Sequence, residues 1–100
     1  MSEAALTEVR GWRELHAALR ARAESLDVSR ETLDHLTGLQ NGYCAKILAP
    51  KPIRNLGRIS FDAMLAVLGL KLIVTEDQDA MEKIRPRLVQ RKHHTRRIKD

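Results

Sequence analysis

A short polar run, Gln40-Asn41-Gly42-Tyr43, lies in the middle of the stretch LTGLQNGYCAKILAP. The amide side chains of Gln40 and Asn41 each present a hydrogen-bond donor and an acceptor side by side, and Tyr43 adds a hydroxyl. Such amides can form paired hydrogen bonds with the edge of an adenine in the major groove of a duplex. Gly42 costs a helix about 1 kcal/mol relative to alanine, so we interpret it as a position where the backbone comes close to a ligand.

Positive charge surrounds this run. The stretch from His35 to Phe61 contains no acidic residue, and the chain has a formal net charge of +5. The basic or small residues that we expect along a phosphate backbone are Arg30, Gly42, Lys46, Lys51, Arg54 and Arg58. Such segregation of charge is typical of surfaces that meet phosphates. On charge alone, the same distribution could also belong to a solvated surface that binds no partner.

Apolar residues spaced three or four apart predict helices on both sides of the polar run. We expect helices over residues 7–26, 30–37, 40–48, 61–68 and 78–84. Ser29 is expected to cap the second helix and Ser60 the fourth, because hydroxyl side chains accept hydrogen bonds from the first free N–H groups. Gly38 and Gly69 are expected to end these helices in the left-handed conformation.

The core is expected to be aliphatic, because 43% of the residues are hydrophobic but only 3% are aromatic. The side chains predicted to face inward are Trp12, Leu15, Leu19, Ala23, Leu26, Leu33, Leu36, Leu39, Tyr43, Cys44, Ile47, Leu48, Phe61, Met64, Leu65 and Leu68. Residues 72–75, LIVT, are predicted to form a short strand. An unpaired strand is an exposed edge, so we expect it to pair with a second copy, or else to continue the last helix.

Two short helices joined by a turn around Gly38 have the layout of a helix-turn-helix. The stretch SRETLDHLTGLQNGYCAKIL is similar to this motif in the Cro/lambda-repressor-like (XRE family) regulators. The likeness rests on Arg30, Glu31 and Leu33, on the turn Thr37-Gly38-Leu39, and on the polar run with Cys44, and it extends over roughly residues 9–75. Two features depart from the family: Arg30 stands where a glutamine often binds a phosphate, and the KPIRNLGR segment is longer and more basic.

The resemblance implies an all-α protein: a lambda-repressor-like five-helix DNA-binding domain, residues 7–75, with the short strand. Residues 76–100 would form a C-terminal extension with a basic flexible tail. It further implies a sequence-specific transcriptional regulator, a repressor that binds double-stranded DNA as a homodimer. Gln40, Asn41 and Tyr43 would then read bases, and the basic residues named above would hold the backbone.

Other function classes find little support in the sequence. We expect no enzyme, no catalytic residue, no cofactor and no metal site, because no phosphate-binding glycine loop, nucleophile motif or CxxC occurs and His93-His94 lacks further ligands. No apolar run reaches the roughly 18 residues that span a bilayer, so no membrane partner is expected. The single cysteine, Cys44, fits a reducing compartment, which predicts a cytoplasmic, nucleoid-associated protein.

Two alternatives remain open. Members of the similar family that are paired with a toxin act as antitoxins, so the resemblance also allows a chain that binds a partner protein, a toxin or a component of the transcription machinery, and autoregulates its operon. It could also be an architectural or RNA-binding protein that uses charge without sequence preference. The basic tail, QRKHHTRRIK, fits an arm on nucleic acid, solubilising sequence, or a segment that orders on a protein.

Overall fold

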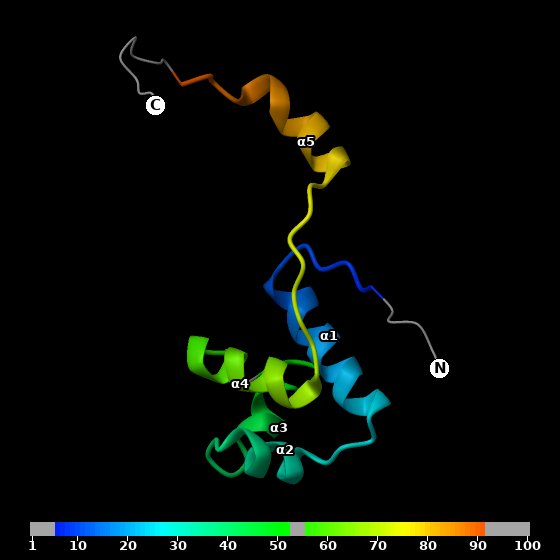
Figure 1. The fold of residues 1–100 in the computed structure, drawn as a ribbon, viewed down its shortest axis with the longest axis vertical. Coiled ribbons are helices and arrows are strands. Elements are labelled where there is room, and N and C mark those ends of the chain that lie inside the picture. The colour runs from blue at the N-terminus through cyan, green and yellow to red at the C-terminus, as the bar shows by residue number, and fades with distance from the viewer. Residues whose placement is uncertain (1–5, 53–55, 92–100) are drawn as a thin grey trace, which may run out of the picture.

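All regular structure in the part of the chain that the computed structural model describes, residues 6–52 and 56–91, is helical. The elements are α1 (Trp12–Ser25), α2 (Arg30–Thr37), α3 (Tyr43–Ile47), α4 (Arg58–Leu68), α5 (Gln78–Ile84) and the 3-10 turn η1 (Arg85–Arg87). Helices α1 to α4 pack together, and α5 stands apart at the end of an extended segment (Figure 1). The prediction of an all-α chain is confirmed. We refer to residues 6–70 as the helical body and to residues 71–91 as the C-terminal arm.

Helix α1 begins five residues later than predicted. Gly11 adopts a fully extended conformation, with φ −172° and ψ 175°, so the chain before Trp12 is not helical. The backbone N–H of Arg10 donates to the carboxylate of Glu14, which satisfies a donor just outside the helix. The break between α1 and α2 is as expected, with Asp27 at φ 54° in the turn.

Helix α2 has the predicted bounds and caps. The hydroxyl of Ser29 accepts from the backbone N–H of Thr32 at 3.0 Å, which is the N-cap hydrogen bond. Glu31 lies in the first turn, where the helix dipole favours negative charge. Gly38 ends the helix in the left-handed conformation at φ 75°, as the sequence predicted.

Helix α4 differs from the prediction at its start. It begins at Arg58 after Gly57, and Ser60 is therefore inside the helix rather than at its cap. Ser60 is buried, and its hydroxyl donates to the hydroxyl of Tyr43 at 3.3 Å. The end is as predicted: Gly69 has φ 66°, and the guanidinium Nε of Arg22 donates to the carbonyl of Leu68 at 2.9 Å.

The core lies between α1, α2, α3 and α4. Its buried hydrophobic members are Leu15, Leu19, Ala23, Leu33, Cys44, Ile47, Leu48, Leu56, Met64 and Leu68. Leu39, Tyr43, Phe61 and Leu65 pack against them while partly exposed. Three inward predictions were wrong, because Trp12, Leu26 and Leu36 are 50%, 42% and 58% exposed. Trp12 and Leu26 lie at the two ends of α1, and Leu36 faces away from the neighbouring helices.

The C-terminal arm contains the predicted helix at Gln78–Ile84 but no strand. Residues 70–77 have no regular structure in the single chain, and the side chains of Leu72, Ile73 and Val74 are exposed. The arm is held to the body by Arg10, whose Nε lies 2.7 Å from a carboxylate oxygen of Asp77. Most of the predicted basic tail lies outside the described residues. No helix in the described ranges is long and apolar enough to cross a membrane.

Candidate nucleic-acid interface

A buried carboxylate fixes the geometry of α2 and α3. Asp34 projects from α2 and is only 3% exposed. One of its carboxylate oxygens accepts from the backbone N–H of Gly42 at 2.7 Å, and the other accepts from that of Cys44 at 2.9 Å. These N–H groups lie at the start of α3, so a side chain of one helix caps the next. The two helices are thereby locked to one another at the turn that carries the polar run.

The charge of Asp34 is part of this arrangement. Burial raises the pKa of the carboxyl, but hydrogen bonds from the thiol and N–H of Cys44 and from the N–H of Gly42 outweigh it, and the net pKa is lowered. Burial, followed by the hydrogen bond with Asp34, raises the pKa of the Cys44 thiol to about 12. The thiol is therefore protonated at neutral pH, which makes Cys44 a buried apolar residue rather than a nucleophile.

The ionised state of Asp34 predicts how stability depends on pH. Because its pKa is lower in the folded protein, its contribution is fully present above the unfolded pKa of about 3.9 and is lost as the pH falls through the folded value. We expect Asp34→Asn to lower the free energy of unfolding near neutral pH and to lose less on acidification than the wild type does. Urea unfolding at about pH 6 and about pH 3 measures both. Equal losses on acidification would show that Asp34 is not ionised in the fold.

The turn between α2 and α3 has further hydrogen bonds of its own. The hydroxyl of Thr37 donates to the carbonyl of Leu33 at 2.7 Å, and its oxygen lies 3.3 Å from the N–H of Leu39. The N–H of Leu39 also donates to the carbonyl of Asp34 at 3.1 Å. This network leaves the next residues, Gln40 and Asn41, on the outside of a fixed turn.

The predicted helix over residues 40–48 is shorter in the structure. Gln40, Asn41 and Gly42 form the turn before α3, and their side chains or backbone are exposed. Gly42 has φ 85°, a conformation that L side chains rarely adopt, so a glycine is required there by the turn. Our sequence interpretation, in which Gly42 sits inside a helix at a cost in stability, was therefore wrong.

This role of Gly42 gives a testable expectation. Gly42→Ala should destabilise the protein by about 1 to 2 kcal/mol, the cost of left-handed backbone for an L residue. Apart from Gly42 and its two chain neighbours, no atom of the described residues lies within 4 Å of the added Cβ, so the loss is one of backbone conformation. Gly57→Ala is the matched control, because Gly57 is equally open but has φ −81°. Thermal unfolding of both variants separates them, and equal shifts would argue against backbone strain.

Tyr43 is less exposed than the two amides. Its ring is partly buried against the core, and its hydroxyl accepts the hydrogen bond from Ser60 of α4. This contact joins the first residue of α3 to α4. Of the three predicted base-reading residues, the structure brings Gln40 and Asn41 together on the exposed turn and holds Tyr43 between the helices.

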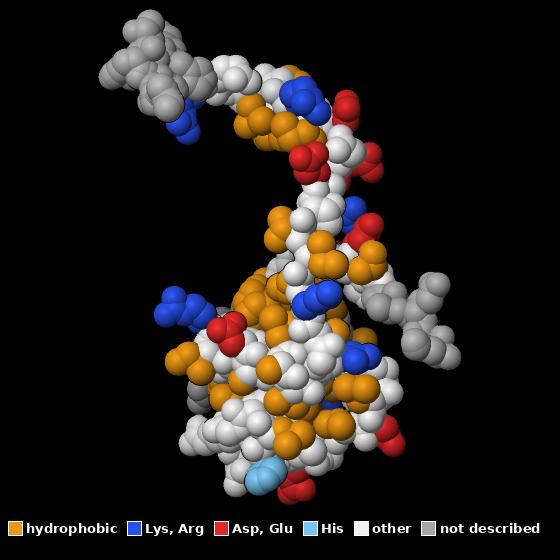
Figure 2. Space-filling model, in the orientation of Figure 1, with side chains coloured by type: hydrophobic (Ala, Val, Ile, Leu, Met, Phe, Trp, Pro, Cys, Tyr) orange, Lys and Arg blue, Asp and Glu red, His pale blue; other side chains and the backbone are white. Residues whose placement is uncertain are grey.

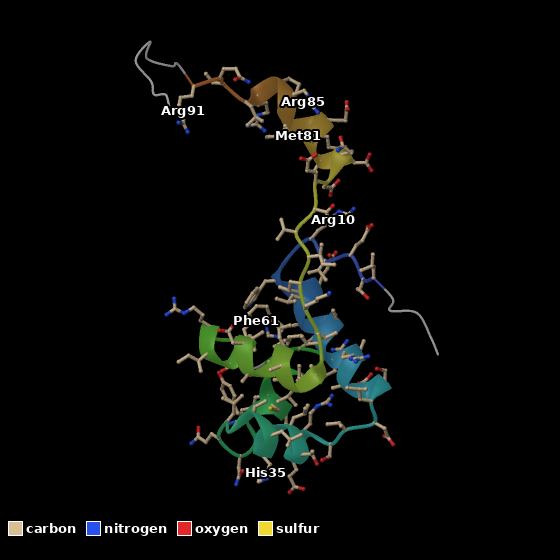
Figure 3. All side chains as sticks on the ribbon, viewed as in Figure 1. Arg10, His35, Phe61, Met81, Arg85 and Arg91 are labelled. Carbon is tan, nitrogen blue, oxygen red and sulfur yellow. The ribbon has the colours of Figure 1, made fainter. Side chains whose placement is uncertain are left out.

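The predicted backbone-contacting residues lie on several elements. Lys46 is exposed in α3, Lys51 in the following loop and Arg58 at the start of α4. Arg30, at the start of α2, lies 3.9 Å from Glu24 in a long ion pair with an exposed partner, which is a weak restraint. Arg54 lies outside the described residues. His35, to which we had assigned no role, is exposed in the last turn of α2, at the lower end of the body (Figure 3).

Two residues that support the interface were missed in the sequence. The side chain of His16 in α1 is buried, and its Nδ1–H donates to the carbonyl of Ile47 at 3.1 Å, which joins α1 to the end of α3. Within the described residues its Nε2 has no hydrogen-bond partner. Asp34 is the other residue that was missed. Its position in the sequence could have revealed it, because a carboxylate in the last turn of a helix is disfavoured by the helix dipole unless it has another partner.

Comparisons with known proteins give no assignment: no family model, no curated protein and no solved structure matches this chain. The described residues also contain no group of three or more His, Cys, Asp or Glu side chains that could hold a metal ion.

Proposed function

We propose that this protein is a sequence-specific double-stranded DNA-binding regulator, which represses transcription by occupying a promoter. The observation that carries the proposal is the pair of hydrogen bonds from the N–H groups of Gly42 and Cys44 to Asp34. We call this pair the Asp34 bracket; it fixes the exposed turn that carries Gln40 and Asn41. Polar side chains at the start of the second helix of such a pair are those that enter the major groove. An exposed polar turn between the second and third helices is also what a lambda-repressor-like arrangement of α1 to α4 would require.

In this proposal Gln40 and Asn41 contact base edges, and Tyr43 orients α3. Lys46, Lys51, Arg54 and Arg58 neutralise phosphates, and Arg30 donates to a phosphate once its long pair with Glu24 is released. The acid-free stretch from His35 to Phe61 supports this division, because no carboxylate on it would repel the backbone. The protein acts without catalysis or cofactor, as a cytoplasmic, nucleoid-associated homodimer whose LIVT segments pair across the two-fold axis.

Binding to nucleic acids of matched length and charge tests the proposal. We expect the chain to prefer duplex DNA over duplex RNA and over single strands at near-physiological salt, as measured by fluorescence anisotropy. Affinity should fall steeply with salt, with a slope that reflects the phosphates neutralised. Equal affinity for all the polyanions would favour the architectural or RNA-binding alternative and remove the base-reading role.

A second candidate function is that of an antitoxin, which binds a partner protein and represses its own operon. The exposed apolar side chains of the C-terminal arm favour an interaction with protein. Co-purification at a fixed stoichiometry with the product of a neighbouring gene would support this candidate. It does not exclude DNA binding, because the two activities use different parts of the chain.

A further inference from the structure

The C-terminal arm exposes apolar side chains that no other part of residues 6–52 and 56–91 covers. No residue from Lys71 to Arg91 is buried, and Ile84 and Leu88 are 38% and 53% exposed. Helix α5 has seven residues, and a helix of this length is not stable alone in water. The arm therefore needs a surface on which α5 packs.

The helical body has an apolar surface of its own beside α1 and α4, which we name the Trp12–Phe61 surface. The indole of Trp12 is 50% exposed, and its ring centroid lies 6.3 Å from that of Phe61. Figure 2 shows hydrophobic side chains on the upper side of the body and others along the side of α5 that is turned toward it, with an open gap between them. In Figure 3, Phe61 lies on the body's side of this gap and Met81 on the arm.

The two surfaces do not meet within one chain. The carboxylate of Asp77 accepts from two donors at once: Nε of Arg10 at 2.7 Å and the backbone N–H of Ala80 at 3.1 Å. The first contact ties the arm to the body, and the second caps α5. Folding α5 back on its own body would break the contact of Asp77 with Arg10.

Charged side chains also lie beside the two apolar surfaces. Residues 76–82, EDQDAME, include four acids and no base. The Trp12–Phe61 surface is flanked by two bases, Arg13 next to Trp12 and Arg58 one turn before Phe61, and by one exposed acid, Asp62, directly after Phe61. Both arginines are exposed, and neither forms an ion pair with any described residue. The acidic start of α5 is thus complementary to these two arginines.

We propose that two copies of the chain exchange their C-terminal arms, so that α5 of each copy packs on the Trp12–Phe61 surface of the other. Glu82 then faces Arg13 of the second copy and Asp79 faces its Arg58, while Met81 and Ile84 cover Trp12 and Phe61. An antiparallel meeting of the two extended LIVT segments brings each arm from its own body to the other, in a closed two-fold arrangement. This inference rests on the homodimer of the proposed function and names the surface that forms it.

Charge reversal with mixing tests the exchange in the full chain without DNA. We expect Glu82→Arg and Arg13→Glu each to weaken self-association at least tenfold in sedimentation equilibrium. An equimolar mixture should recover dimers, because one contact then joins the two substituted side chains and the other joins the two unsubstituted ones. Unchanged association in either variant, or no recovery in the mixture, would overturn the proposal.

Trp12 provides an independent readout because it is the only tryptophan. Its emission should shift to shorter wavelength as the protein concentration rises, and Met81→Ser/Ile84→Ser should abolish this shift and the dimer. Leu36→Ser is the matched control, since Leu36 is exposed on α2 outside the arm and the Trp12–Phe61 surface. Emission that does not change with concentration would contradict the exchange. A monomer that still selects a single DNA half-site would overturn it while leaving the DNA-binding function intact.

Discussion

Asp34→Ala is expected to lower the free energy of unfolding by roughly 2 to 4 kcal/mol. The substitution removes both acceptors from the start of α3, and the N–H of Cys44 stays buried without a partner. A buried donor left unsatisfied costs about 1 to 3 kcal/mol, and a hydrogen bond to a charged group contributes about 1.5 to 3 kcal/mol. Since small domains have about 5 to 15 kcal/mol in total, this loss is large. Urea unfolding followed by circular dichroism measures it.

Asp62→Ala is the control for the loss of a carboxylate as such. Asp62 is exposed on α4 and belongs to neither the core nor the turn. We expect its replacement to change the free energy of unfolding by less than about 0.5 kcal/mol. If Asp34→Ala lowered the free energy of unfolding no more than this control does, the hydrogen bonds to Asp34 would not be what fixes α3 against α2.

Asn41→Ala is expected to cost roughly 1 to 3 kcal/mol of binding free energy on the preferred duplex and almost nothing on random DNA. The side chain is exposed on the turn and outside the core, so the fold should not change. An amide paired with a base contributes about this much to discrimination against other bases. Anisotropy titrations on the two duplexes at the same salt measure the difference.

Lys51→Ala is the matched control for charge without base reading. Lys51 is an exposed cation in the loop after α3, and its loss should weaken binding to both duplexes alike and reduce the salt slope by about one unit. If Asn41→Ala also lost equal affinity on both duplexes, Asn41 would contact the backbone and would carry no sequence information.

Local signals in the sequence predicted α2 and α5 closely. Ser29 and Gly38 bound α2 because a capping hydroxyl and a left-handed glycine act within a few residues of themselves. The same holds for Gly69 at the end of α4. For α2 and α4, short-range chemistry and tertiary packing agree, and periodicity identified the buried leucines of α1 and α4.

Long-range contacts account for the errors. Helix α3 starts at Tyr43 because Asp34 of α2 caps it and Gly42 is left-handed, and neither is visible in the spacing of apolar residues. Ser60 is a residue type that often caps helices, but it lies within α4, where its hydroxyl donates to that of Tyr43. The exposure of Trp12 could not be read from its apolar character, because it depends on how α1 crosses α4.

The sequence predicted which residues make up the candidate interface, but not the contacts that hold its turn in place. The run of amides and the acid-free stretch pointed to the exposed turn, while the carboxylate that makes the turn rigid was read as an ordinary helix residue. The paired role of Asp34 depends on two backbone N–H groups eight and ten residues later in the chain. Such pairing depends on the tertiary fold.

The most direct test of the central claim is a selection of bound sites from a random duplex library, run in parallel with the wild type and Asn41→Ala at fixed near-physiological salt. For the wild type we predict an enriched inverted repeat whose half-sites lie about ten base pairs apart, as two recognition helices of a dimer require. For Asn41→Ala we predict the same repeat with the preference lost at one position in each half-site. No enriched sequence for the wild type, or an unchanged motif for the variant, would contradict base reading by this turn.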